Sequence, residues 1–171
     1  VDMDSVYRDY DPERASGYDG EYALFRCLMQ TSYFNNAKLL TNLVIPTGNG
    51  NKTTEIDMLL ITEKGIIVFE VKNYKGTIYG QIDEQYWTQY FRTVNNNKFF
   101  NPIRQNAYHS KALSLLYPGT IHSVVIFTSP DCDIRRVETL SSSCVVADLH
   151  SLSAVLRKIS NLDNELLSDE I

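Results

Sequence analysis

The sequence predicts an α/β fold in which a mixed central sheet is flanked by helices. Two apolar runs, Glu55–Thr62 and Ile66–Asn73, flank a short polar turn and are typical of a hairpin of buried strands. Asn101 and Pro102 form a strong helix start, and the unbroken apolar run Val124–Phe127 indicates a buried strand after that helix. Helices alternating with buried strands in this way are typical of an α/β sandwich.

The chain has 171 residues, of which 43% are apolar, so we expect one domain with a hydrophobic core. A net charge of −5 argues against a domain that holds nucleic acid by a broad basic surface. Cys27, Cys132 and Cys144 lack metal-ligand spacing, so we expect reduced thiols in a cytoplasmic protein. No apolar run approaches the ~20 residues that span a bilayer, and we expect no signal peptide. The predicted parts are an N-terminal arm at 1–16, a domain at 17–162 and an acidic tail at 163–171.

The first elements of the domain are a helix, a strand and a loop. Apolar residues recur at helical spacing from Asp19 or Gly20 onward, which places Glu21 in the first turn. An acid there suits the helix dipole and needs no further function. Ala37–Ile45 predicts the first strand, and Pro46–Lys52 is a loop rich in turn-forming residues.

The second half of the chain adds short strands and two helices. Aromatic residues interleaved with Lys75, Arg92 and Lys98 suit stacking against a nucleic-acid strand, although a half-buried strand with one solvated face is the simpler explanation. The expected elements are strands at Thr77–Tyr79 and Tyr86–Arg92, a turn at 94–98, a helix from Pro102 to about Tyr117, strands at Ile121–Thr128 and Cys144–Ala147, and a helix over Leu152–Ile159.

The central hairpin brings charged side chains together at its far end. With a two-residue turn at Glu63 and Lys64, Asp57 lies opposite Glu70, and their Cβ atoms are about 4.5–5.5 Å apart. Lys72 follows Glu70 by two residues and therefore shares its face of the strand.

Two facing carboxyl groups at the end of an apolar hairpin cannot both ionise cheaply. Either one takes a proton or a cation lies between them, and a divalent metal with oxygen ligands is such a cation. The alternative is a cluster without function in which Lys72 forms ion pairs with both acids.

Asp57 followed by Glu70, Val71 and Lys72 resembles the D…(D/E)-x-K signature of restriction-endonuclease-like nucleases. The longer similarity is to the nuclease-related domain (NERD) family, covers roughly residues 17–130, and implies an αβββαβ core. The matching positions are Gly20-Glu21, Glu55-Ile56-Asp57, Gly65, Glu70–Asn73, Gly76–Gly80, Trp87, Asn101-Pro102, Gln105 and His109.

The resemblance implies a nuclease that hydrolyses DNA with Mg²⁺ or Mn²⁺. It implies that Asp57, Glu70 and the carbonyl of Val71 hold the metal. Lys72 then orients a water molecule or stabilises charge on phosphorus, and Gln105 supports the metal from the facing helix.

Further residues gain a role only from the resemblance or from their positions. By similarity, Glu21 is an additional acid of the site, and His109 either holds a substrate phosphate or positions Gln105. Lys52, in the loop before the hairpin, and Lys75, just after it, are candidate phosphate contacts.

A rival interpretation is a nucleic-acid-binding or protein-interaction module that keeps the nuclease fold without turnover. The acidic composition favours this module, whereas the retained Asp57, Glu70 and Lys72 favour the enzyme. A homodimer through an edge strand and fused or partner domains remain open, as do the choice between endo and exo cleavage and between DNA and RNA.

Overall fold

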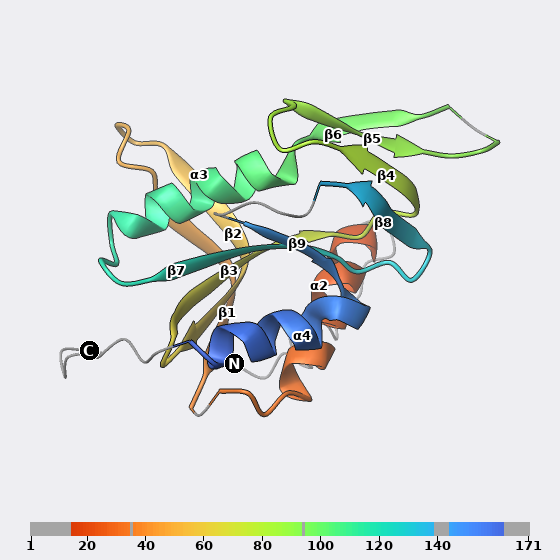
Figure 1. The fold of residues 1–171 in the computed structure, drawn as a ribbon. Coiled ribbons are helices and arrows are strands. Elements are labelled where there is room, and N and C mark those ends of the chain that lie inside the picture. Colours follow the sequence, from red (N-terminus) through yellow and green to blue (C-terminus); the bar gives the residue numbers. More distant parts are fainter. Residues whose placement is uncertain (1–14, 35, 94, 139–143, 163–171) are drawn as a thin grey trace.

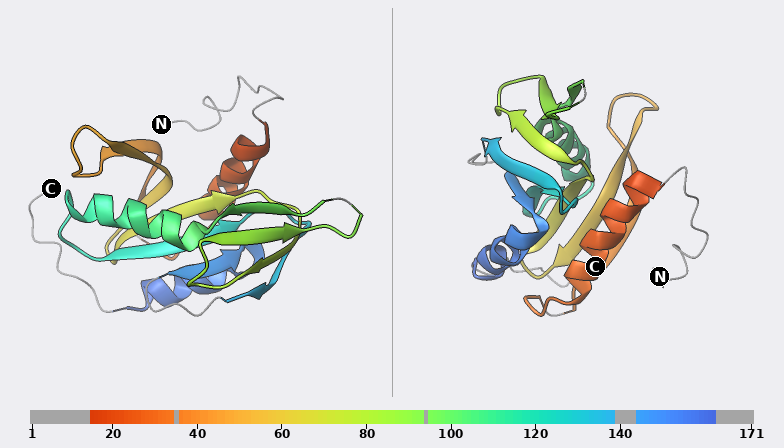
Figure 2. Two further views of the ribbon diagram at one scale, coloured as in Figure 1. Left: turned by 90° about the horizontal axis from the view of Figure 1, so that it is seen from above. Right: turned by 90° about the vertical axis from the view of Figure 1, so that its right-hand side faces the viewer.

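The structure is a computed structural model that describes residues 15–34, 36–93, 95–138 and 144–162 (Figures 1 and 2). The predicted arm up to residue 14 and the predicted tail from residue 163 lie outside this part. The elements, in chain order, are α2 (Ala15–Met29), β1 (Lys38–Pro46), β2 (Thr53–Thr62), β3 (Gly65–Lys72), β4 (Gly76–Gly80), β5 (Tyr86–Tyr90), β6 (Asn97–Phe100), α3 (Pro102–Ser114), β7 (Ile121–Phe127), β8 (Cys132–Val137), β9 (Val145–Asp148) and α4 (Leu149–Ser160).

Within the described ranges the strands form two sheets, so the predicted α/β class with a mixed sheet is confirmed. The larger sheet has the order β1-β2-β3-β7-β9, with antiparallel pairs up to β3 and parallel pairs from β3 to β9. The smaller sheet has the order β6-β5-β4-β8 and forms the upper right part of Figure 1. Strand β3 therefore lies at the centre of the larger sheet.

The central hairpin has the predicted turn and register, since Thr62 pairs with Gly65 across Glu63 and Lys64. Gly65 has a φ of +104°, and a Cβ at this position would collide with the carbonyl oxygen of Thr120. A residue with a side chain would be strained here, so the turn requires glycine.

Helices cover both faces of the larger sheet (Figure 1). Leu24 of α2 and Leu152 of α4 are buried against one face together with Phe69. Ala112 of α3 is buried against the other face with Val68. A third apolar cluster joins the smaller sheet to the larger one and to α3; it includes Ile78, Trp87, Phe99, Ile103, Val125 and Phe127.

Several predicted boundaries are wrong. Helix α2 begins by Ala15, so Asp19 and Gly20 lie inside it and Glu21 is not in its first turn. Helix α3 ends at Ser114, three residues before the predicted Tyr117.

Two strands were not predicted. Strand β6 begins at Asn97, inside the predicted turn at 94–98, and β8 over Cys132–Val137 is new. A run of asparagines precedes β6, and three of the six residues of β8 are charged, so neither has the apolar pattern of a buried strand.

The start of α3 is as predicted. The side chain of Asn101 accepts a hydrogen bond from the backbone N–H of Ile103, and Pro102 occupies the first turn. The Asn101 amide also donates to the carbonyl oxygen of Glu84, at 2.7 Å. This cap fixes where α3 leaves the smaller sheet and therefore where its first turns meet the hairpin.

No helix in the described ranges is long and apolar enough to cross a bilayer.

Candidate functional site

Asp57 and Glu70 come together at the end of the central hairpin. The last paired residues are Met58 and Phe69, and one further step in the same register sets Asp57 against Glu70. Asp57 Oδ2 accepts a hydrogen bond from the backbone N–H of Val71, at 2.8 Å. The predicted proximity of the two acids is therefore present, with Asp57 held by the backbone that follows Glu70.

The carboxylate of Glu70 is buried, with 1% of its side chain exposed, and both of its oxygens have partners. Lys72 Nζ lies 2.6 Å from Oε1, and His109 Nε2 lies 3.1 Å from Oε2. A buried carboxylate is stable only when it is paired and hydrogen-bonded. Glu70 meets that condition through the protein alone.

Lys72 forms no ion pair with Asp57 in the part of the chain that the structure describes, so it does not bridge the two acids. Its ammonium group instead donates to Gln105 Oε1, at 3.2 Å. Only 15% of the Lys72 side chain is exposed. The lysine is thus held between a carboxylate of its own strand and an amide of α3.

Gln105 and His109 lie one turn apart on α3, and both face the end of β3. The other ring nitrogen of His109, Nδ1, lies 2.8 Å from the hydroxyl of Thr54. A ring protonated at Nε2 donates to Glu70 and accepts from Thr54, so both nitrogens are satisfied. His109 is buried and contacts Glu70 instead of Gln105.

Gly20 determines how closely α2 approaches this end of the sheet. A Cβ on Gly20 would lie 2.7 Å from Thr128 Oγ1 and 2.8 Å from the Cβ of Asn73, closer than real Cβ contacts. A side chain at this position would push the helix away from the ends of β3 and β7. The glycine therefore brings the next residue, Glu21, to the site.

Glu21 is a poorly compensated acid. Burial, together with the charges of Asp57 and Glu55, raises its pKa from 4.5 to about 7. Its Oε2 atom is buried without a hydrogen-bond partner among the described residues. The interpretation of Glu21 as a helix-dipole residue is wrong, because the residue lies beyond the first turn and near Asp57.

Asp57 is in a similar situation. Burial and, to a smaller extent, the charge of Glu70 raise its pKa from 3.8 to about 6. The Val71 N–H, Lys72 and His109 offset part of this shift. Two neighbouring carboxyl groups with raised pKa values form a region of uncompensated negative charge.

Carboxylate and carbonyl oxygens are suitable ligands for a hard divalent cation, so the chemistry of these residues fits a metal. Their side chains are not arranged as a complete metal site. No three His, Cys, Asp or Glu side chains in the described ranges converge as a metal-binding group. The buried, unpartnered oxygen of Glu21 beside Asp57 is nevertheless the kind of donor that Mg²⁺ takes. In a strand, the N–H and the C=O of one residue point to the same side. Because the Val71 N–H donates to Asp57, the Val71 carbonyl also points to the side of β3 on which Asp57 lies.

Lys52 and Lys75 are not part of this cluster. Lys52 is exposed in the loop between β1 and β2. Lys75 is 72% exposed and lies 3.8 Å from Asp131, a loose surface pair. Neither has a contact with the acids of the site in the described structure.

Two residues that support the site, Thr54 and Asn106, were not predicted from the sequence. Thr54 has no signal beyond being polar near the start of a strand. Asn106 is fully buried, and its Nδ2 lies within hydrogen-bond distance of the Val68 carbonyl, the Ser123 hydroxyl and the Val124 carbonyl. Its spacing of three residues from both Ile103 and His109 was a usable signal for the buried face of α3.

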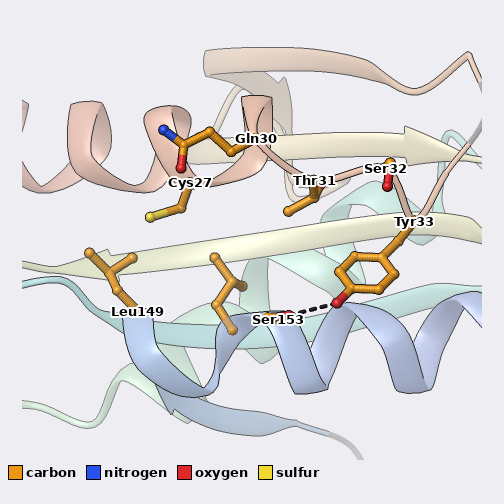
Figure 3. A pocket seen from close by; sticks show the side chains of 8 residues that line it. Cys27, Gln30, Thr31, Ser32, Tyr33, Leu149 and Ser153 are labelled. Carbon is orange, nitrogen blue, oxygen red and sulfur yellow. Dashed lines mark hydrogen bonds between the residues drawn. The ribbon is translucent and has the colours of Figure 1, made fainter.

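A pocket of about 360 Å³ lies elsewhere, between the end of α2 and the start of α4 (Figure 3). Tyr33 and Ser153 close one end of it through a 2.6 Å hydrogen bond between their hydroxyl groups. Its lining contains none of the predicted site residues: it consists of Cys27, Gln30, Thr31, Ser32, Tyr33, Leu149, Leu152 and Ser153.

Comparisons with known proteins agree with the geometry. The family model for the nuclease-related domain matches residues 16–128, which include each acid of the site as well as Lys72, Gln105 and His109. An uncharacterized protein of Bacillus anthracis is 32% identical over 176 residues, covering all of this chain and 78% of that protein. No solved structure gives a significant match. The chain belongs to the nuclease-related domain (NERD) family.

Proposed function

We propose that this domain is a metal-dependent nuclease that hydrolyses phosphodiester bonds of DNA. The observation that supports this most is the uncompensated pair Glu21 and Asp57, set beside a buried Glu70 whose charge is already balanced. A structural cluster has no need of two carboxyl groups with raised pKa values, whereas a cation site does.

Mg²⁺ or Mn²⁺ would be held by Asp57, Glu70 and the Val71 carbonyl, with Glu21 as a further acid. The metal would supply a Lewis acid for the phosphate and a lowered pKa for a bound water molecule. For Glu70 to take part, one of its oxygens must be shared between the metal and either Lys72 or His109.

Lys72 has the role of stabilising charge on the phosphorus or orienting the attacking water. Its ammonium group is held by two acceptors, Glu70 and Gln105, which leaves its third proton for a substrate oxygen. Gln105 thereby acts as a positioning residue for Lys72. His109, supported by Thr54, positions Glu70.

A second candidate is nucleic-acid binding without cleavage on the same fold. It is favoured by the pairing of both Glu70 oxygens within the protein, which removes any need for a metal at that residue.

A cleavage assay separates the two candidates. Supercoiled circular DNA and linear DNA are incubated with the protein and Mg²⁺ or Mn²⁺, beside Asp57→Asn and a matched control, Asp83→Asn, at an exposed position. We expect cutting by the wild type and Asp83→Asn only, and cutting of the circle would establish an endonuclease. DNA binding without cutting in any metal would favour the binding module instead.

A further inference from the structure

Exposed aromatic side chains gather on one face of the smaller sheet. In the described part of the chain, five aromatic side chains are strongly exposed. Four of them belong to the smaller sheet, and the fifth, Tyr108, belongs to α3. We name the other four the aromatic face; they are 39–52% exposed and comprise Tyr79, Tyr86, Tyr90 and Phe100. Contiguous exposed apolar surface of this kind generally marks an interaction site.

Strand alternation explains why these rings point outward. Along β5, Trp87 and Gln89 are buried against the protein, so Tyr86 and Tyr90 occupy the opposite face. Ile78 of β4 is likewise fully buried, which turns Tyr79 outward.

The rings are arranged edge to face with open surfaces beside them. Tyr79 and Tyr90 have centroids 6.0 Å apart at 85°, and Tyr86 and Phe100 are 6.1 Å apart at 82°. A small side chain stands across the ladder from two of these rings, because Thr88 pairs with Tyr79 and Thr77 pairs with Tyr90. This alternation of rings and threonines leaves room for flat groups to stack.

Cations stand at both ends of the row that contains Tyr79. The strand registers set Lys98, Thr88, Tyr79 and Arg136 side by side across all four strands. Neither Lys98 nor Arg136 has an ion pair with a carboxylate in the described ranges. With strands about 4.8 Å apart, the Cα atoms of Lys98 and Arg136 are roughly 14 Å apart, on either side of the row.

A polar hollow adjoins the Arg136 end of the row. It has a volume of about 360 Å³ and is lined by Thr77, Tyr79, Asp133, Arg135 and Arg136. Arg135 is occupied by Asp133 through hydrogen bonds of 2.8 and 2.7 Å, which also lower the pKa of Asp133 to about 2. Arg136 is therefore the cation of the hollow that is free to meet an anion.

We propose that the aromatic face binds single-stranded DNA, with bases stacked on the tyrosines and phosphates held by Lys98 and Arg136. Rings that stack bases, flanked by cations that follow the backbone, are the physical requirements of single-strand binding. Duplex DNA does not offer its base faces, so it cannot use the rings. The choice of DNA over RNA rests on the proposed nuclease function, whereas the binding itself does not need catalysis.

The aromatic face is close to the candidate site along the chain. Strand β3 ends at Lys72 and β4 begins at Gly76, so the two are joined by three residues that span at most about 14 Å. A few nucleotides cover that distance.

Binding is tested by fluorescence anisotropy of a labelled 15-nucleotide dT strand in EDTA, where no cleavage occurs. Asp57→Asn serves as a second background that cannot cut, so a failed nuclease proposal does not affect the result. The same measurement is made with a 15-nucleotide rU strand and a 15-base-pair DNA duplex. We expect the dT strand to bind more tightly than either.

Tyr79→Thr combined with Tyr90→Thr should weaken dT binding at least about fivefold per ring removed, because base stacking on an aromatic contributes about 1–3 kcal/mol. Tyr79→Phe should bind like the wild type, since the ring is kept. Tyr108→Ala is the matched control, at 49% exposure on another face, and should have no effect.

Lys98→Gln gives a readout that does not depend on the rings, and the substitution should leave the sheet folded because Lys98 is exposed. It should reduce the salt dependence of dT binding by about 0.7 in the log–log slope, the value for one phosphate contact to a single strand. Equal dT affinity of the tyrosine double variant and wild type, stronger binding of the duplex or rU, or self-association abolished by the double variant would each overturn the proposal.

Discussion

The two sides of the candidate site differ in charge balance. On the α3 side, Glu70 is buried but is contacted by Lys72 and His109, so its charge is compensated. On the α2 side, Glu21 and Asp57 both have raised pKa values, the charge of Asp57 contributes to the shift of Glu21, and Glu21 has a buried oxygen without a partner in the described structure.

The difference in charge balance assigns different roles to the two sides, holding Lys72 on one and binding a cation on the other. The D…E-x-K sequence pattern does not distinguish these roles. The α3 side is stable without a ligand and holds Lys72 in place, which suits a group that acts on a substrate. The α2 side is under electrostatic strain that a divalent cation would relieve. Substitutions on the two sides of the site, and metal binding, test this distinction.

The largest effect is expected on catalysis from the α3 side. Lys72→Met should lower DNA cleavage by around 10²-fold or more, the range lost with one electrostatic partner of the transition state. Metal binding should be retained, because a protonated lysine is not a ligand. Rates are measured beside Lys75→Met, an exposed control, with melting curves to confirm folding. Unchanged cleavage by Lys72→Met would reduce the lysine to a structural partner of Glu70.

The next effect concerns the metal-free protein on the α2 side. Asp57→Asn should increase the free energy of unfolding at pH 8 by about 1–2 kcal/mol, allowing for solvent screening of the shift to a pKa of about 6. Asparagine can still accept from the Val71 N–H. Because the pKa is higher in the folded state, the penalty is complete above pH 6 and fades as the pH falls to about 4. Urea unfolding at pH 8 and pH 4 measures this, and a loss of stability at pH 8 would contradict the charge imbalance.

Metal binding should relieve the same strain. Mg²⁺ or Mn²⁺ at ten times its dissociation constant should stabilise the wild type by about 1.4 kcal/mol, which is roughly 3–6 °C in melting temperature. Asp57→Asn should lose most of this shift. Equal shifts in the two proteins would mean that the metal binds elsewhere.

The smallest effect is expected at Glu21. Glu21→Gln should increase the metal-free stability at pH 8 by less than about 1 kcal/mol, because the group is only partly buried and solvent screens its charge. The gain should disappear as the pH falls from about 7 toward 4.5, since the folded state then takes up the proton. Asp19→Asn, at an exposed position of the same helix, is the control. An identical pH profile in Glu21→Gln and wild type would remove Glu21 from the site.

The sequence predicts best what depends on local geometry. The two-residue turn at Glu63 and Lys64 sets the register of the hairpin, and that register alone brings Asp57 to Glu70. The cap at Asn101 and Pro102 likewise sets the start of α3. In each case the residues that determine the structure are neighbours in the chain.

Features that depend on tertiary packing could not be predicted from the sequence pattern. The contact between His109 and Glu70 requires α3 to cross the hairpin at one particular angle, and no spacing encodes that angle. Strand β8 pairs with β4 although it is rich in charged residues, because its outer side faces solvent. The start of α2 was placed too late because its first turn lacks the apolar period of the rest.

The three contacts of Asn106 determine how stiff the α3 side can be. Its amide meets groups of both β3 and β7, so α3 cannot roll about its axis without giving up these contacts. Gln105 and His109 flank Asn106 on the same helix, and any roll would carry both away from Lys72 and Glu70 together. Under the proposed function, adjustment to substrates of different shape would come from side-chain rotation or from the α2 side, with α3 as the fixed reference against which a bound strand would be aligned.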